Sequence, residues 1–240
     1  MTPAPVIDVA EDAEALAGKV ARFVAARMSS APDRFGLSLS GGTTPKRIYE
    51  LLGAGNLGVP LDWRKLHLFW GDERFVPMDH ADSNFRMARE AFIDHVPIPP
   101  AQVHPILTGT GTPENSAALY EQTLQSFYGS KTLEPERPLF DVTLLGLGED
   151  GHIASLFPGT KALNERGAWV TPVIGAKPEP RVSLTYPALE SSGVILFVVS
   201  GAKKRDVLSR VLANEQALPA ARLATRGTIY LFADRAALPG

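Results

Sequence analysis

The 240-residue chain contains no cysteine, which excludes several kinds of chemistry. Without thiols there is no disulfide framework, no thiolate-bound metal and no cysteine nucleophile. A strong charge of either sign is also missing, because 24 lysine and arginine residues oppose 26 aspartate and glutamate residues, for a formal net charge of −2. Such a balance gives no indication of a surface for nucleic acid or for an anionic membrane.

Long apolar runs are absent too. The longest covers residues 194–199, far short of the roughly 20 residues that a membrane-spanning helix needs. The first eight residues have no basic stretch ahead of an apolar one, so we expect no secretion signal and a cytoplasmic protein. The sequence has no paired-histidine spacing that would predict a catalytic metal. It also has no Gly-x-Ser-x-Gly elbow, the motif that would predict a serine hydrolase of the α/β type.

What the chain does contain is an alternation of strand-like and helix-like segments, with enough apolar residues, 45%, for a sizeable core. This alternation predicts one Rossmann-like α/β domain over residues 1–240, with a mostly parallel sheet flanked by helices on both faces. The expected strands are residues 35–40, 66–70, 141–145, 181–185, 194–199 and 228–233. The expected helices are residues 12–28, 45–52, 83–92, 115–128 and 203–213, and residues 159–180 are expected to be irregular.

The most informative segment is residues 146–158, which read Gly-Leu-Gly-Glu-Asp-Gly-His-Ile-Ala-Ser-Leu-Phe-Pro and follow an apolar strand. A glycine-rich turn at the carboxyl end of a strand is where open α/β sheets usually place a site. His152 on this turn can act as a general base near neutral pH, with Asp150 beside it. Because no nucleophile is evident, a base that activates water is the simplest chemistry.

The same turn matches a dinucleotide-binding fingerprint, Gly-x-Gly-x-x-Gly, at Gly146, Gly148 and Gly151. That fingerprint needs a helix opening at the third glycine and an acid about 20 residues further on. Pro158 leaves little room for such a helix, and the next acid, Glu165, comes too early. The pattern therefore disfavours a nicotinamide or flavin cofactor.

Two further motifs follow predicted strands. Residues 40–45, Ser-Gly-Gly-Thr-Thr-Pro, can turn tightly and present free N–H groups at a helix start, with Thr43 or Thr44 as its cap, so phosphate is the natural guest. An ordinary capped turn is the alternative. Residues 70–76, Trp-Gly-Asp-Glu-Arg-Phe-Val, offer Arg74 to a substrate oxygen or a developing oxyanion, and Asp72 to a substrate hydroxyl. A solvated charge cluster at a strand end is the alternative there.

Two basic residues complete the candidate set. Arg181 opens a predicted strand, and Lys203 follows Ser200-Gly201 at a predicted helix start. Either can reach a phosphate at the loop that begins with Ser40. We expect Lys204 and Arg205 to lie on the solvated face of the helix.

Five segments, residues 39–45, 70–77, 82–85, 145–158 and 181–185, together resemble the 6-phosphogluconolactonase family and span most of the chain. The resemblance implies hydrolysis of 6-phospho-D-glucono-1,5-lactone to 6-phospho-D-gluconate, a step of the oxidative pentose phosphate pathway, without metal or organic cofactor. It implies that His152 is the base that deprotonates water, and that Asp150 orients the imidazole or holds the sugar. It assigns Asp72 and Arg74 to the active site. The implied phosphate ligands are Ser40, Gly41, Gly42, Thr43, Arg181 and Lys203.

The resemblance also implies a partner set: a small sugar-phosphate lactone as substrate, no nucleic acid, no membrane, and a monomer or small homo-oligomer. A related family, the glucosamine-6-phosphate deaminases or isomerases, shares the phosphate loop and the Asp-Gly-His turn. It typically carries Asp-Glu-Tyr where this chain has residues 72–74, and Asn-Glu-Pro where it has the Ser-Leu-Phe-Pro tail. A non-catalytic sugar-phosphate sensor is a third reading, which intact Asp150 and His152 disfavour.

Overall fold

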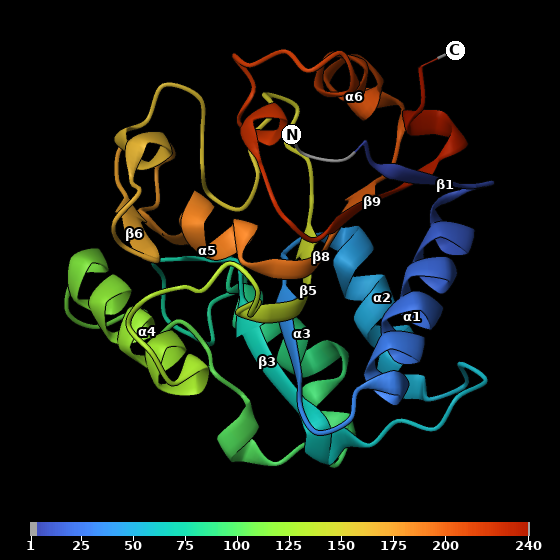
Figure 1. Cartoon of the computed structure of the whole chain (residues 1–240), viewed down its shortest axis with the longest axis horizontal. Helices are drawn as coiled ribbons and strands as arrows, with labels where there is room; N and C mark the ends of the chain where they lie inside the picture. The colour runs from blue at the N-terminus through green and yellow to red at the C-terminus, as the bar shows by residue number, and fades with distance from the viewer. Residues whose placement is uncertain (1–3, 240) are drawn as a thin grey trace.

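A six-stranded parallel β-sheet forms the centre of the protein (Figure 1). The structure, a computed structural model, describes residues 4–239. All neighbouring strands of this sheet pair in parallel, which confirms the predicted fold class. In spatial order the strands are β1 (Val6–Ala10), β9 (Thr228–Asp234), β8 (Ser192–Val199), β5 (Phe140–Leu145), β2 (Phe35–Leu39) and β3 (Leu66–Trp70).

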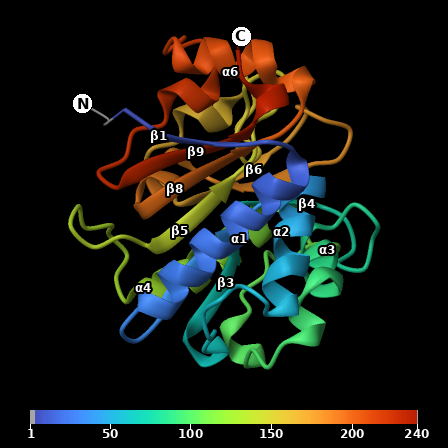
Figure 2. The same ribbon diagram turned by 90° about the vertical axis from the view of Figure 1, so that its right-hand side faces the viewer.

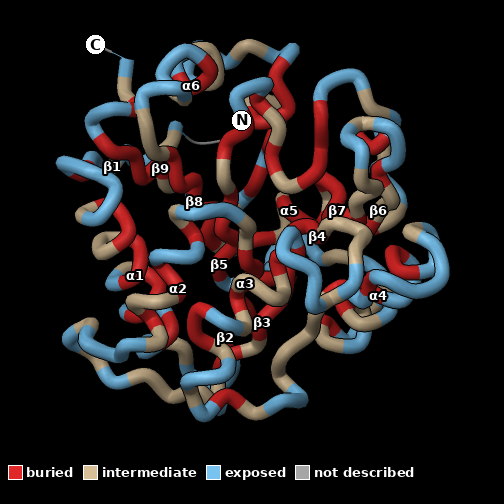
Figure 3. The backbone as a smooth tube through the Cα atoms, turned by 180° about the vertical axis from the view of Figure 1, so that it is seen from behind, coloured by how far each residue is buried: buried red, intermediate tan, exposed pale blue. Residues whose placement is uncertain are grey.

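Helices cover both faces of this sheet. They are α1 (Ala13–Ser30), α2 (Thr43–Ala54), α3 (Asn84–Ala91), α4 (Pro113–Tyr128), α5 (Tyr186–Glu190) and α6 (Arg205–Leu212). In Figure 1, α1 and α2 lie on one side of the sheet and α4 and α5 on the other, and Figure 2 shows α1 and α2 in front of the strands. Figure 3 shows that the central strands are mostly buried, whereas exposed backbone gathers in the peripheral loops. Burial on both faces explains why strand sequences such as residues 194–199 are continuously apolar.

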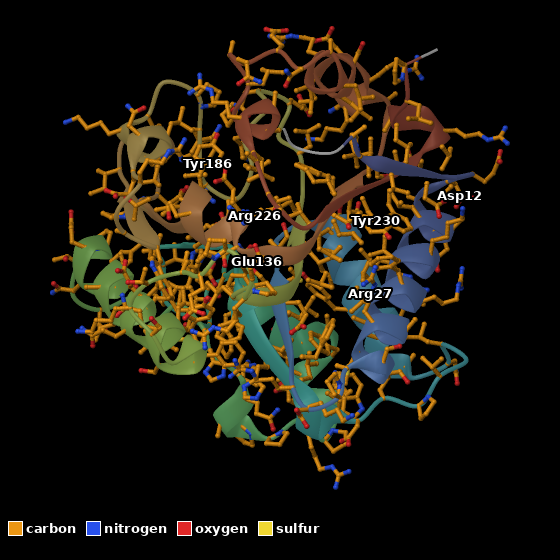
Figure 4. The ribbon with its side chains drawn as sticks, in the orientation of Figure 1. Asp12, Arg27, Glu136, Tyr186, Arg226 and Tyr230 are labelled. Atoms are coloured by element: carbon orange, nitrogen blue, oxygen red, sulfur yellow. The ribbon has the colours of Figure 1, made fainter. Side chains whose placement is uncertain are left out.

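The contact of α1 with the sheet shows how the outer layer is attached. Asp12 caps the helix, with its Oδ1 accepting a hydrogen bond from the Ala15 N–H at 2.8 Å. Near the other end of the helix, Arg27 reaches the Tyr230 hydroxyl of β9 (Figure 4). The Phe23 ring lies 4.8 Å from the ring of Tyr230, so apolar and polar contacts together fix α1 across the edge of the sheet.

Helix starts agree with the sequence prediction at α3 but not at α2. Ser83 caps α3 as predicted, accepting from the Arg86 N–H at 3.1 Å. Helix α2 was expected to begin at Pro45 under a threonine cap, but it begins at Thr43, and its cap is Gly42, which makes no side-chain hydrogen bond. The φ of Gly42 is 112°, a conformation that favours glycine. The threonine-cap prediction is therefore wrong, and the first N–H groups of α2 have no side-chain cap.

A second, antiparallel sheet continues directly from β3. Its strands, in the order β4-β7-β6, are β4 (Asp72–Arg74), β7 (Arg181–Leu184) and β6 (Val170–Val173). The expected strand at residue 181 thus exists but lies outside the parallel sheet, and β6 falls in the segment that was expected to be irregular. β1, β4 and α5 were also not predicted. β4 has only three residues, too few to show an alternation, and β6 contains Pro172, which argues against a strand in a sequence.

The strand order leaves a crevice at the carboxyl edge of the parallel sheet. The chain moves from β2 to β3 through α2, whereas from β5 it moves in the opposite direction to β8, and β2 and β5 are neighbours. Where the direction reverses, the loops after the two strands lead to opposite faces and leave a gap between them. Residues 40–42 and residues 146–152 enter this gap.

Two buried tyrosines form hydrogen bonds with the backbone at the ends of β2 and β3, next to the crevice. The Tyr49 hydroxyl donates to the Ser40 carbonyl at 2.8 Å and accepts from its N–H at 2.9 Å. The Tyr120 hydroxyl does the same for Trp70, at 3.0 and 2.8 Å. Burial raises the pKa of both phenols above its ordinary value, so both keep their proton. The backbone is satisfied where pairing stops, and the residues that follow are free to form the site.

Candidate active site

His152 and Asp150 form a close pair on the turn after β5. His152 Nδ1 lies 2.5 Å from Asp150 Oδ1, and the His152 backbone N–H donates to the same oxygen at 3.2 Å. Burial raises the pKa of Asp150, but the hydrogen bonds and charge of His152, aided by Lys177, outweigh burial and leave that pKa below its ordinary value. An ionised carboxylate only accepts, so Nδ1 carries a proton, and in the neutral form of the ring Nε2 is the nitrogen that holds the lone pair. The pair is therefore arranged as an oriented base.

Glycines make this turn possible. A Cβ on Gly148 would lie 2.0 Å from His152 Nδ1 and 2.7 Å from Asp150 Oδ1, so only glycine leaves room for the pair. Gly151 adopts a φ of 80°, which also favours glycine. No helix starts directly at Gly151, because residues 151–158 form turns with a bridge between Ile153 and Leu156. The dinucleotide fingerprint thus lacks the helix that it requires.

A cavity of about 220 Å³ opens beside the pair. Seven of the predicted site residues line it: Ser40, Gly41, Gly42, Asp72, Arg74, His152 and Arg181. Wider hollows exist elsewhere on the described part of the chain, including one of about 800 Å³ beside residues 133–138. Those hollows lack the combination of a base, a buried acid and cations, so this chemistry identifies the smaller cavity as the candidate site.

Three predicted residues lie outside the cavity lining. Asp150 is not part of the lining, but its Oδ1 contacts Nδ1 of His152, which lines the cavity. Thr43 is exposed at the first position of α2. Lys203 is exposed as well, and Lys204, which was expected to face solvent, lines the cavity instead. The reason is that a 3₁₀ turn, Ala202–Lys204, precedes α6, so the helix starts two residues later than predicted and the side chains point differently.

Asp72 lies in the wall of the cavity and is 8% exposed. Its Oδ2 accepts a hydrogen bond from Ser155 Oγ at 2.5 Å, which connects β4 to the turn that carries His152. Its carbonyl accepts from Asn84 Nδ2 at 2.9 Å. Asn84 in turn packs so closely on Gly41 that a Cβ there would lie 2.1 Å from its Oδ1. The phosphate-loop candidate, β4 and the turn that carries His152 therefore pack together as one unit.

Arg74 and Arg181 lie directly opposite each other on two neighbouring strands of the second sheet, β4 and β7. The Nε atoms of both are buried and find no hydrogen-bond partner within residues 4–239, and the Arg181 side chain is 14% exposed. Burial and the charge of Arg74 lower the pKa of Arg181, against the opposing effect of nearby acids. Like charges directly opposite on a sheet are unfavourable. Two such arginines at a cavity are typical of a site for an anion.

Sequence reasoning missed several residues that line the cavity, among them Asn84, Ser155, Phe157 and Lys204. Phe157 packs its ring 4.4 Å from the His152 ring. Ser155 and Phe157 stand in the histidine motif, so their position was a usable signal. Asn84 stands in residues 82–85, a segment that also carries the resemblance, whereas Lys204 has no signal of its own because its orientation depends on where a helix begins.

Within residues 4–239, no group of three or more histidine, aspartate or glutamate side chains is placed to hold a metal ion. Within the same residues, no helix has both the length and the apolar character needed to cross a membrane.

Comparison with known proteins decides the family. The model of the family described as glucosamine-6-phosphate isomerases/6-phosphogluconolactonase matches residues 11–231. The chain belongs to this family. A 6-phosphogluconolactonase of Nostoc sp. is 41% identical over 238 residues, which are 96% of each chain. A 6-phosphogluconolactonase of Synechocystis sp. is 39% identical over 241 residues, covering 98% of this chain and 97% of the relative.

Solved structures agree with this assignment. The 6-phosphogluconolactonase of Thermotoga maritima superposes with a TM-score of 0.82 at 30% identity, covering 96% of this chain and 100% of the other. That of Trypanosoma cruzi gives 0.85 at 30% identity, with 99% and 97% covered. A monomeric glucosamine-6-phosphate deaminase also matches, with a TM-score of 0.81, but at 22% identity it shows the shared fold alone.

Proposed function

We propose that this chain hydrolyses 6-phospho-D-glucono-1,5-lactone to 6-phospho-D-gluconate. The observation that carries the proposal is the His152–Asp150 pair beside a small cavity lined by Arg74 and Arg181, whose buried Nε atoms have no hydrogen-bond partner among the described residues. Relatives that match over nearly their whole length bear the name 6-phosphogluconolactonase, which supports the same activity. The enzyme is accordingly a hydrolase that acts on a carboxylic ester.

His152 acts as the base in this proposal. Its Nε2 takes a proton from water as the water oxygen attacks C1 of the lactone, and Asp150 stabilises the imidazolium that forms. The tetrahedral intermediate collapses with cleavage of the bond between C1 and the ring oxygen, and the imidazolium returns its proton to that oxygen. Water is added across the ester, and the product carboxylic acid then ionises. A positioned base is worth about 10²–10⁴-fold in rate.

We assign the substrate phosphate to the cationic side of the cavity. Arg181 and Lys204 supply charge, and the loop through Gly41 and Gly42 supplies N–H groups at the start of α2. Because Arg74 is the register partner of Arg181, we assign it to the phosphate as well rather than to the oxyanion. A dianion between the two arginines relieves their repulsion and orients C1 toward His152.

Asp72 is assigned to a sugar hydroxyl. One of its carboxylate oxygens is occupied by Ser155. The other accepts no hydrogen bond from the described residues, while the side chain lines the cavity. A carboxylate held in place by a buried serine can accept from a substrate hydroxyl at little entropic cost.

Two expectations about the whole protein stay proposals: a cytoplasmic location, and a monomeric or small homo-oligomeric state. Rice relatives 37% identical to the chain carry the description chloroplastic, so the family is not confined to one compartment. Cell fractionation and light scattering of the purified protein test the two points.

The deciding experiment measures hydrolysis of freshly generated 6-phosphogluconolactone against the spontaneous rate. We expect His152→Ala to lower kcat by about 10²–10⁴-fold, because the general base is lost. The matched control is His95→Ala, since His95 is exposed and does not line the cavity, and it should keep the wild-type rate.

A wild-type protein that gives no rate above background contradicts the proposed function. Deamination of glucosamine-6-phosphate is then assayed, since that family shares the fold. If wild-type activity is high and survives His152→Ala, the function stands and the assignment of the base is wrong.

A further inference from the structure

Glu73 has no part in the mechanism above, yet it is 1% exposed and lies directly between Asp72 and Arg74. Its Oε1 accepts hydrogen bonds from the N–H groups of Arg74 and Asn84, both at 2.8 Å. Its Oε2 accepts from the Phe85 N–H at 2.7 Å and from Ser83 Oγ at 3.2 Å. The buried carboxylate thus accepts four hydrogen bonds, which together hold it in one orientation.

These donors identify what Glu73 connects. Ser83 is the cap of α3, and Asn84 and Phe85 are the first two residues of the helix, whose N–H groups have no partner within the helix. Glu73 satisfies them from β4, eleven and twelve positions earlier in the chain. A negative charge is also favourable at this end of a helix. The carboxylate therefore joins β4 to the first turn of α3.

Both elements at this junction present side chains to the cavity. Arg74 comes from β4, and Asn84 from α3. Arg74 Nη1 donates to the Asp82 carbonyl at 2.6 Å, just ahead of the helix, so the orientation of the guanidinium depends on where α3 begins relative to β4. Nothing else in the proposed mechanism explains why a carboxylate is buried here.

We propose that Glu73 is a positioning residue for the reaction, holding β4 and the start of α3 together so that Arg74 and Asn84 face the substrate. This inference rests on the proposed function, in which Arg74 binds the substrate phosphate. Glu73 itself does not touch substrate. Its contribution is to fix the geometry of groups that do, a contribution that an isosteric amide cannot make because its NH₂ would face backbone N–H groups.

Burial raises the pKa of Glu73 to about 7, against the lowering effect of the three backbone N–H groups and with a further increase from Asp72. The other charged or titratable groups that it influences are Arg181 of β7 and Tyr120 of α4. Binding is therefore measured at pH 8, where the carboxylate form predominates. The ligand is the product, 6-phosphogluconate, because the lactone hydrolyses spontaneously.

The test is a double-mutant cycle on the Kd of 6-phosphogluconate, measured by calorimetry for the wild type, Glu73→Gln, Arg74→Gln and the double variant. We expect Glu73→Gln to weaken binding about tenfold in the wild-type background and less than threefold when Arg74 is already replaced. Equal losses in both backgrounds overturn the proposal, as does a Glu73→Gln protein that binds within twofold of the wild type.

Two further variants separate positioning from general destabilisation. Ser192→Ala removes a buried hydrogen-bonding hydroxyl at the start of β8, away from the cavity, and should lower Tm without changing Kd. If Glu73→Gln does not fold, Ser83→Ala takes its place, because it removes one of the four donors to Glu73. It should weaken binding about threefold, and only when Arg74 is present.

The outcomes for the two proposals are distinct. Absence of lactone hydrolysis by the wild type contradicts the proposed function whatever the cycle shows. Hydrolysis by the wild type with no coupling between Glu73 and Arg74 leaves the function intact and overturns the role of Glu73.

Discussion

The proposed catalytic pair, His152 and Asp150, depends on a glycine, which has no side chain. Gly148 lies against the imidazole and the carboxylate, and its own N–H donates to the His152 carbonyl at 2.9 Å. Any side chain here would push the two groups apart. At the scale of single residues, the geometry of the base is thus set as much by this glycine as by the two titratable groups.

We predict that Gly148→Ala lowers kcat/KM about 10²-fold, since displacing a catalytic group by an ångström costs roughly that much. The added methyl would lie 2.0 Å from His152 Nδ1, so the ring must move. Steady-state kinetics together with a heat-unfolding curve check this, because the loss should appear in a protein that is still folded.

The matched control is Gly146→Ala in the same turn. A Cβ at Gly146 would find its nearest neighbour, Ser40 Oγ, at 3.8 Å, which is an ordinary contact. A loss below threefold is expected for this variant. Similar losses for both glycines would mean that the turn, rather than the clash with the pair, is responsible.

At the scale of elements, the start of α2 matters because it faces the cavity uncapped. Gly42 allows the loop to enter the helix with a φ of 112° and no side chain over the N–H groups. Gly55 at the other end of the same helix also has a positive φ, of 73°, but lies far from the cavity lining. Substituting each glycine therefore distinguishes the effect of backbone strain, expected at both positions, from an effect on ligand binding, expected only at Gly42.

We predict that Gly42→Ala and Gly55→Ala each lower the free energy of unfolding by about 1–3 kcal/mol, the cost of a positive φ for a residue with a Cβ. Only Gly42→Ala should also raise KM for the lactone, by about tenfold, because its loop is displaced from the phosphate. Urea unfolding and steady-state kinetics on both variants measure these effects. An equal change in KM for the two would refute a specific role for the α2 start.

At the scale of the whole molecule, a histidine pair outside the site affects stability. His67 Nδ1 lies 3.2 Å from His104 Nε2, and the ring of Phe69 stacks on His104 at 4.6 Å. Burial lowers the pKa of His104 to about 4, helped by His67, and burial and the charge of Arg34 lower the pKa of His67. The folded protein thus keeps both rings neutral over a pH range in which unfolded histidine, with a pKa near 6.5, is charged.

Because the unfolded state then binds more protons, stability is complete above about pH 6.5 and is lost as the pH falls toward 4. We predict that His104→Gln, which does not titrate, reduces this loss by about 1–2 kcal/mol after allowance for partial exposure of the ring. Urea unfolding at several pH values between 7 and 4.5 measures the difference. The control is His95→Gln, because His95 is exposed. If the free energy of unfolding of His104→Gln depends on pH as it does in the wild type, the histidine pair does not cause the loss of stability at low pH.

The sequence by itself determined the features that are encoded within a few residues. His152 and Asp150 are two positions apart, so their pairing is a property of one turn. The Ser83 cap and the apolar strands of the parallel sheet were predictable for the same reason: local hydrogen bonds and hydrophobic periodicity are written in neighbouring residues.

Only the tertiary structure decided which distant residues share the cavity. Asp72 and Ser155 meet across 83 positions, and Arg74 faces Arg181 because β4 and β7 pair in a second sheet that the sequence did not predict. Lys204 replaces Lys203 because a short 3₁₀ turn shifts the start of α6. Which residues line the cavity depends on strand register and on where helices begin. Both are set by packing between distant segments and have no local signature in the sequence.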